Sequence, residues 1–165
     1  MSRTTKFAAV AASAAAAATA VVGLTAAPAL AVTPGTFTAT LQGNMVINAG
    51  VSVITCTSSV LKGAVAANGA TTTYTSATIG GCGVTVTPGG LPWSGSISGG
   101  LVKINGFKMR VLDCLYGGTL TGTYPPTTVN FPLTVTFSNQ VVPKSGGSLC
   151  SSSATVTATY KYTQP

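Results

Sequence analysis

Short runs in which apolar residues alternate with threonine or serine fill most of this chain, and this alternation restricts the fold more than any other feature. Residues 36–41 read TFTATL, and residues 154–163 read ATVTATYKYT. A two-residue period places apolar side chains on one face of a β-strand and polar side chains on the other. No window shows a convincing helical period, so we expect an all-β fold.

Turn-forming residues divide the chain into about ten short strands. Glycine pairs, prolines and two Asn-Gly pairs end the alternating runs, as they do in hairpin turns. We expect an antiparallel β-sandwich, with a small barrel as the alternative. The candidate strands are residues 36–41, 45–48, 51–57, 60–66, 70–78, 84–87, 93–98, 101–104, 107–112, 119–124, 129–138 (which Pro132 divides) and 154–163.

One predicted hairpin can be derived residue by residue from the pair Asn105-Gly106. A two-residue turn there would pair Ile104 with Phe107 and Lys103 with Lys108. Alternation then places an apolar set on one face and a basic set on the other. We expect these exposed lysines to protect an edge strand against aggregation; the alternative is that the basic face contacts an anionic partner. The apolar set is Val102, Ile104, Phe107, Met109 and Val111, and the basic set is Lys103, Lys108 and Arg110.

Residues 1–31 have the composition of a secretory signal peptide. Arg3 and Lys6 precede an alanine-rich apolar stretch, and Ala29-Leu30-Ala31 supplies the small-x-small cleavage pattern. We expect cleavage after Ala31, which leaves one secreted domain at residues 32–165 without a transmembrane helix. The alternative is an uncleaved membrane anchor, since about 18 apolar residues can span a bilayer.

Four cysteines in an exported chain predict two disulfide bonds. Among the three connectivities, the spacings favour Cys56–Cys82 with Cys114–Cys150. Each bond would contribute roughly 3–4 kcal/mol in the chain-entropy model. A metal site is the alternative use of four thiols, but the chain has no close Cys-x-x-Cys pair, so we expect no metal.

The chain has almost no residues suited to catalysis. It contains no histidine and no glutamate, and Asp113 is its one acidic residue. A Ser-His-Asp triad, the paired carboxylates of a glycosidase and most general acid–base chemistry therefore lack their side chains. No phosphate-binding glycine motif is present. We expect a protein that is not an enzyme and has no cofactor.

The predicted secreted domain is basic, and it has a single tryptophan. Six Lys or Arg residues against Asp113 give it a formal charge of +5. We expect these charges mainly to keep the domain soluble; the alternative is that they attract acidic partners such as wall polymers, anionic lipid or nucleic acid. We expect no specific nucleic-acid partner. Trp93, within GLPWSG, is expected to anchor the core between two sheets; alternatively its ring binds an apolar ligand.

Three short motifs carry a resemblance to known families. They are ITCTSS at residues 54–59, IGGC at 79–82 and GLPW at 90–93. With the two later cysteines and the threonine-rich last strand, they resemble a group of uncharacterised secreted proteins of actinobacteria, which implies secretion and an all-β fold. The layout is also similar to secreted PraB-type proteins associated with alkane oxidation. That similarity implies help with dispersing or capturing apolar substrates.

Three functions from different classes are compatible with these features. The first is a non-catalytic extracellular or surface-associated β domain, structural or adhesive, that meets cell-envelope polymers through Lys103, Lys108 and Arg110. The second is a carrier of small apolar, alkane- or lipid-like ligands near Trp93. The third is a membrane-active barrel, although few of the strands reach the 9–11 residues that such barrels use.

Overall fold

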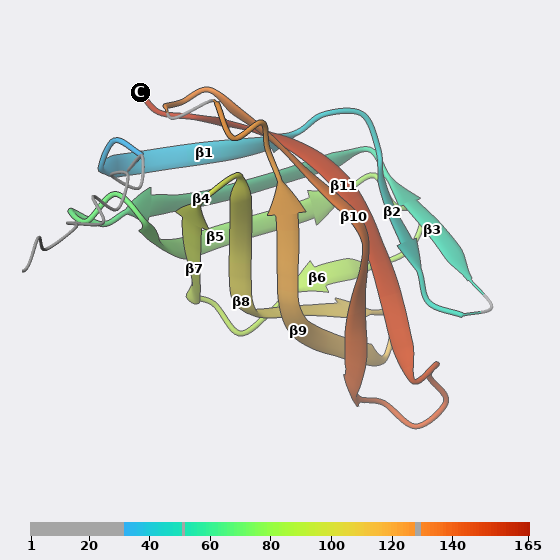
Figure 1. The fold of residues 1–165 in the computed structure, drawn as a ribbon. Helices are drawn as coiled ribbons and strands as arrows, with labels where there is room; N and C mark the ends of the chain where they lie inside the picture. Colours follow the sequence, from blue (N-terminus) through green and yellow to red (C-terminus); the bar gives the residue numbers. More distant parts are fainter. Residues whose placement is uncertain (1–31, 51, 128–129) are drawn as a thin grey trace, which may run out of the picture.

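The computed structural model describes residues 32–50, 52–127 and 130–165, and the predicted signal peptide lies outside these residues (Figure 1). All secondary-structure elements in the described part of the chain are β-strands. No helix that could cross a membrane occurs in it. The strands are β1 (Gly35–Leu41), β2 (Met45–Asn48), β3 (Val53–Cys56), β4 (Ser58–Val65), β5 (Thr71–Gly80), β6 (Val86–Pro88), β7 (Trp93–Ser98), β8 (Leu101–Val111), β9 (Cys114–Thr123), β10 (Leu133–Gly146) and β11 (Ser153–Thr163).

Eight antiparallel strands close into an up-and-down barrel. Their order is β1-β4-β5-β7-β8-β9-β10-β11, and β11 pairs back onto β1, where Thr38 lies opposite Thr163. The other three strands lengthen this wall: β2 and β3 continue β1 and β4, and β6 pairs with the part of β8 that β7 does not reach. The all-β antiparallel fold is confirmed, and of the two architectures expected the structure has the barrel.

The turn predicted at Asn105-Gly106 is wrong, because both residues lie inside β8. The chain reverses instead at Gly99 and Gly100, whose φ angles of +57° and +80° suit glycine. At residues 105 and 106, β8 bulges, so that two of its residues face Thr119 alone on β9. The bulge brings Ile104 and Phe107 to the same side. The predicted apolar face is therefore correct, and its five side chains are buried.

Glycines on the inner wall make room for the aromatic rings that fill the barrel. Phe37 packs against Gly63, where an added Cβ would lie 2.8 Å from the ring. Phe137 packs against Gly122 in the same way, at 2.9 Å. Pairing a large residue with a small one on the neighbouring strand fills a small barrel without voids. The largest fully buried side chains are Trp93, Tyr74, Tyr116, Tyr162 and Phe137.

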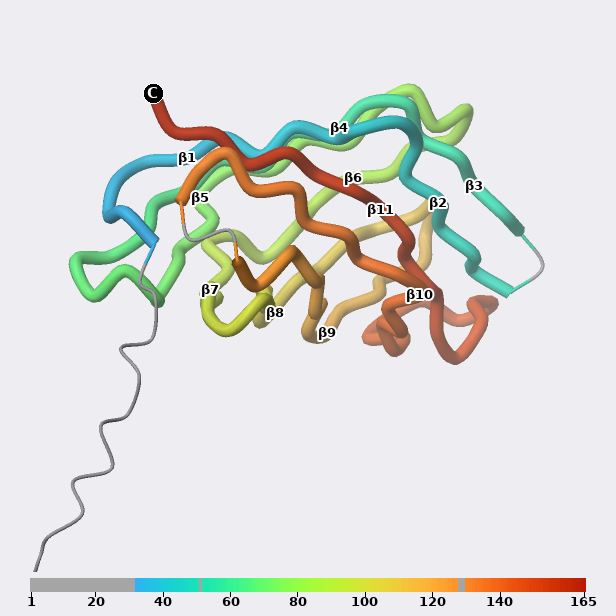
Figure 2. Tube along the Cα trace, turned by 45° about the horizontal axis from the view of Figure 1, so that its top comes forward, coloured from blue at the N-terminus to red at the C-terminus, as the bar shows by residue number. Residues whose placement is uncertain are grey.

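The structure contains both predicted disulfide bonds. Cys56–Cys82 joins the end of β3 to the segment that follows β5. Cys114–Cys150 joins the start of β9 to the loop between β10 and β11. Both bonds therefore lie near one end of the barrel, the end at which the β2–β3 connection and the β10–β11 loop come together, away from the C-terminus (Figure 2).

Candidate functional site

The barrel interior is a packed core. The free space at its centre has a volume of about 10 Å³ and is bounded by apolar side chains such as Trp93, Phe107, Phe137 and Tyr160. Such a volume admits about one water molecule. An alkane chain would fit only after several of these side chains had moved, so the interior is not a ligand chamber of the kind found in larger barrels.

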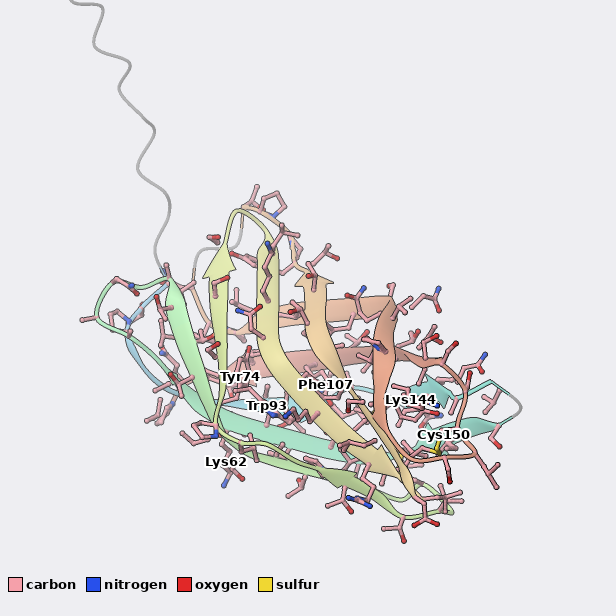
Figure 3. All side chains as sticks on the ribbon, turned by 90° about the horizontal axis from the view of Figure 1, so that it is seen from below. Lys62, Tyr74, Trp93, Phe107, Lys144 and Cys150 are labelled. Carbon is pink, nitrogen blue, oxygen red and sulfur yellow. A yellow bond between two sulfur atoms is a disulfide. The ribbon has the colours of Figure 1, made fainter. Side chains whose placement is uncertain are left out.

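Trp93 occupies this core. Its side chain is 1% exposed, and its ring centroid lies 5.0 Å from that of Phe107. The indole Nε1 donates a hydrogen bond of 2.8 Å to the carbonyl oxygen of Gly89, which satisfies its polar edge. Figure 3 shows Trp93 near Phe107 and Tyr74, within the ring of strands. The core position expected for Trp93 is the one observed, in a barrel rather than between two sheets.

The buried tyrosine hydroxyls bond to each other or to neighbouring polar groups. The hydroxyls of Tyr74 and Tyr162 lie 3.2 Å apart, and Tyr160 donates to Ser59 Oγ over 2.8 Å. Burial raises the pKa of Tyr74 and of Tyr160 to about 12, and it raises the pKa of Tyr162 still further. These phenols are therefore neutral at physiological pH, which suits a structural role.

Four strand connections meet at one end of the barrel, which we call the mouth. They join β2 to β3, β5 to β6, β8 to β9, and β10 to β11. Leu112 N donates to Thr85 O over 3.1 Å, which links the second connection to the third. A Cβ added at Gly50 would lie 2.9 Å from Ser151 Oγ, so the first and fourth connections are also in contact. The Cys114–Cys150 bond joins the start of β9 to the fourth connection, so the mouth is a continuous surface.

Three of the connections at the mouth carry an exposed apolar side chain, and β3 begins with a fourth, Val53, directly after the β2–β3 connection. Val53 is 67% exposed, Val84 38%, Leu112 58% and Leu149 99%. Among the described residues, only two other large apolar side chains are comparably exposed, Leu101 at the opposite end and Val141 on β10. Scattered exposed apolar residues are ordinary, whereas four gathered at one end point to a contact surface.

A groove of about 440 Å³ opens between three of these connections. Ile54, Val111, Leu112, Tyr116 and Leu149 line it, together with the Cys114–Cys150 bond. Leu112 also has a φ of +52°, in the left-handed region that costs a non-glycine residue about 1–2 kcal/mol. Glycine or asparagine would relieve this strain. A residue that is both strained and exposed with an apolar side chain suggests a function.

The three basic residues singled out in the sequence all lie on the outer face of β8. Lys103, Lys108 and Arg110 are exposed. They form one line along the strand, however, and Lys103 lies opposite Ser96 and Thr121 rather than opposite Lys108. The predicted pairing of the two lysines is wrong because the chain does not turn at Asn105-Gly106. The remaining described lysines, Lys62, Lys144 and Lys161, are on β4, β10 and β11.

Leu112 and Leu149 were not singled out from the sequence because each is an isolated apolar residue that the structure places in a turn. Leu149 follows Gly-Gly-Ser, and Leu112 precedes Asp113, the one acidic residue. Their only signal is that a strongly apolar side chain stands where a turn would favour a polar one. No group of three His, Cys, Asp or Glu residues gathers anywhere in the part of the chain that the structure describes.

Comparison with known proteins gives one match. The family model described as alkane oxidation protein activator PraA/PraB-like matches residues 1–164, nearly the whole chain. No curated protein and no solved structure shows a significant similarity. The match agrees with the second of the two resemblances seen in the sequence; the resemblance to actinobacterial secreted proteins stays a prediction.

Proposed function

The chain belongs to the alkane oxidation protein activator PraA/PraB-like family, and we propose that it is an exported, non-catalytic barrel that binds alkane-like or lipid-like compounds at its mouth. The observation that carries this proposal is the set of exposed apolar side chains at one end, on three of the connections and on the first residue of β3. The adjoining groove supplies an apolar lining. The family name supports a ligand of this class.

The size of the apolar set suits reversible binding. Full transfer of one Val or Leu side chain from water to hydrocarbon stabilises by about 1.5–3 kcal/mol. Four partly exposed side chains would together contribute roughly 4–8 kcal/mol, which corresponds to dissociation constants between about 1 mM and 1 μM. The Cys114–Cys150 bond holds the connections that carry Leu112 and Leu149. This arrangement lowers the ordering cost of binding.

The two other locations for an apolar partner have less support. A ligand beside Trp93 would have to enter a core whose free volume is about 10 Å³. A membrane-spanning barrel would need an apolar outer band, whereas the outward positions of β1, β9 and β11 are largely threonine. We therefore place the ligand at the mouth rather than inside the barrel or around it.

Two features support the exported and non-catalytic parts of the proposal. Disulfide bonds persist mainly in oxidising compartments, and this chain has two. The absence of histidine and glutamate leaves Asp113 as the one carboxylate side chain, at the β8–β9 turn. A single carboxylate in an exposed turn lacks the second group that acid–base catalysis normally uses.

The test combines Leu112→Asn with Leu149→Ser. Asparagine tolerates the left-handed conformation, so folding should be kept while the apolar contact is lost. Removing both leucines should cost about 3 kcal/mol of binding, or roughly 100-fold, in partitioning onto hexadecane droplets. Val141→Ser is the matched control, because Val141 is 60% exposed but lies on β10, outside the mouth. Unchanged partitioning of the double variant, with its melting temperature preserved, would refute the proposal.

A further inference from the structure

We propose that the β8 basic row, formed by Lys103, Lys108 and Arg110, docks a linear phosphodiester polymer of the cell envelope along the outer wall of the barrel. All three side chains are exposed on the outward face of one strand. The row lies on the barrel wall, whereas the proposed apolar site lies on the connections at its end. The two proposals therefore rest on different residues.

Protection of a strand edge does not account for these three cations. β8 pairs with β7 and β6 on one side and with β9 on the other, so its backbone is covered on both sides. Lysines guard strands whose hydrogen-bonding groups face solvent. Because β8 is an inner strand of a closed wall, its basic row has no edge to protect, and another reason for the clustering is needed.

The geometry of the row suits a linear partner. Strands rise by about 3.4 Å per residue, so Lys108 and Arg110 are about 7 Å apart along β8. Lys103 lies about 14 Å beyond Lys108, because the bulge takes one residue out of the rise. Most neighbours across the ladders are small: Ser96 and Thr121 flank Lys103, and Gly117 flanks Lys108, whereas Thr87 and the half-buried Leu115 flank Arg110. A chain with repeated negative charges can follow the line from Lys103 to Lys108 without meeting a large side chain.

Lys108 is held in position by two glycines. A Cβ added at Gly90 would lie 2.9 Å from Lys108 Cδ, and one added at Gly117 would lie 3.0 Å from Lys108 Cγ. The lysine stem thus occupies space that only glycine leaves free. Ordering a free lysine side chain on binding costs rotamer entropy. Part of this cost is already met in the unbound protein, which favours a role in binding.

The partner must be anionic and needs no stacking surface. Asp113 is the only Asp or Glu in the chain, so at most one of the cations can pair with a carboxylate side chain of the same molecule. The described Trp, Tyr and Phe side chains are buried, apart from the half-buried Phe131. Proteins that hold single-stranded nucleic acid stack bases on exposed rings. A polymer read through its phosphates alone fits better, since Lys and Arg both bind phosphate.

The test measures binding of poly(glycerol phosphate) to the mature protein and to two triple variants. Lys103→Gln, Lys108→Gln and Arg110→Gln remove the row. Lys62→Gln, Lys144→Gln and Lys161→Gln remove the same charge from other strands. We expect at least tenfold weaker binding for the row variant and less than a twofold change for the control. Three phosphate contacts should also make binding roughly 20-fold weaker between 50 and 200 mM salt.

Three outcomes would overturn the proposal. Equal loss in both triple variants would show that net charge alone attracts the polymer. Absence of binding by the folded wild-type protein would remove the site. Tighter binding of an oligothymidylate or of alginate than of poly(glycerol phosphate) would assign the row to another polyanion. Partitioning of the row variant onto hexadecane, expected to be unchanged, keeps this result separate from the proposed function at the mouth.

Discussion

Replacing Trp93 with alanine should destabilise the protein by about 4–6 kcal/mol. Trp93 is 1% exposed and packs on Phe107. Large-to-small substitutions of buried aromatic residues cost about 3–5 kcal/mol. Loss of the Nε1 hydrogen bond leaves the Gly89 carbonyl without this donor, which adds about 1 kcal/mol. Small domains have about 5–15 kcal/mol of total stability, so the loss should be conspicuous.

Urea unfolding followed by circular dichroism measures this loss without depending on tryptophan emission. Trp93→Phe is the companion variant: it keeps a ring beside Phe107 but removes the donor to Gly89, so we expect a loss of about 1–2 kcal/mol. The wild-type protein has a single tryptophan, so its emission reports on this site alone. That emission should be blue-shifted, resistant to iodide and unaffected by added alkane.

A loss below about 1 kcal/mol for Trp93→Ala would contradict the packing argument, because a buried indole cannot be removed from a filled core at so small a cost. Red-shifted emission that iodide quenches readily would do the same. Quenching by alkane without a change in stability would move the apolar site from the mouth to the region of Trp93.

Two further predictions concern the core. Burial raises the pKa of Tyr74 and Tyr160 from 10 to about 12, and it raises the pKa of Tyr162 further, so the folded state holds these protons more tightly than the unfolded state. The stabilising contribution of the three tyrosines is complete below about pH 10. Between pH 10 and 12 it falls by about 1.4 kcal/mol per pH unit for each tyrosine. Melting temperatures should be measured between pH 8 and 12, with absorbance at 295 nm to follow tyrosine ionisation. We expect these three phenols to ionise only when the protein unfolds, and ionisation of any of the three in the folded protein near pH 10 would contradict this. Gly122→Ala should cost about 1–3 kcal/mol, because the new methyl group would lie 2.6 Å from Val135 Cγ1 and 2.9 Å from the Phe137 ring. Gly89→Ala, where a Cβ has no neighbour within 4 Å, should be nearly neutral by the same denaturation measurement, and equal losses in the two variants would contradict the account of the filled barrel.

Strict alternation made β11 predictable, whereas β8 was divided, β9 was expected only from residue 119 and β10 was expected to end at residue 138. In β11, Val156, Ala158, Tyr160 and Tyr162 share one face in the sequence, and all four are buried. Asn105-Gly106 gave a wrong turn prediction because a bulge and a two-residue turn both place Ile104 and Phe107 on the same face of the sheet. The hydrophobic pattern is therefore identical in both cases. Only the pairing of β8 with its neighbours distinguishes them.

The candidate site at the mouth could not be predicted in the same way. Leu112 and Leu149 are far apart in the chain, and nothing near either residue indicates that they share a groove. Their proximity follows from the up-and-down order, in which every second connection lies at the same end. A sandwich with the same strands would have distributed the four apolar residues differently, so the architecture had to be known first.

The pairing of β1 with β11 determines when this molecule can be completed. Every other neighbouring pair in the barrel joins strands that are close in the sequence, with only β2 and β3 between β1 and β4 and only β6 between β5 and β7, so these pairs can form soon after synthesis of their second strand. The seam from Thr38–Thr163 to Leu41–Tyr160 needs the last strand. Until β11 emerges, β1, β2 and β10 each present an unpaired edge. During passage through a narrow channel from its N-terminus, a polypeptide of this order could not close its barrel until almost the whole chain had passed.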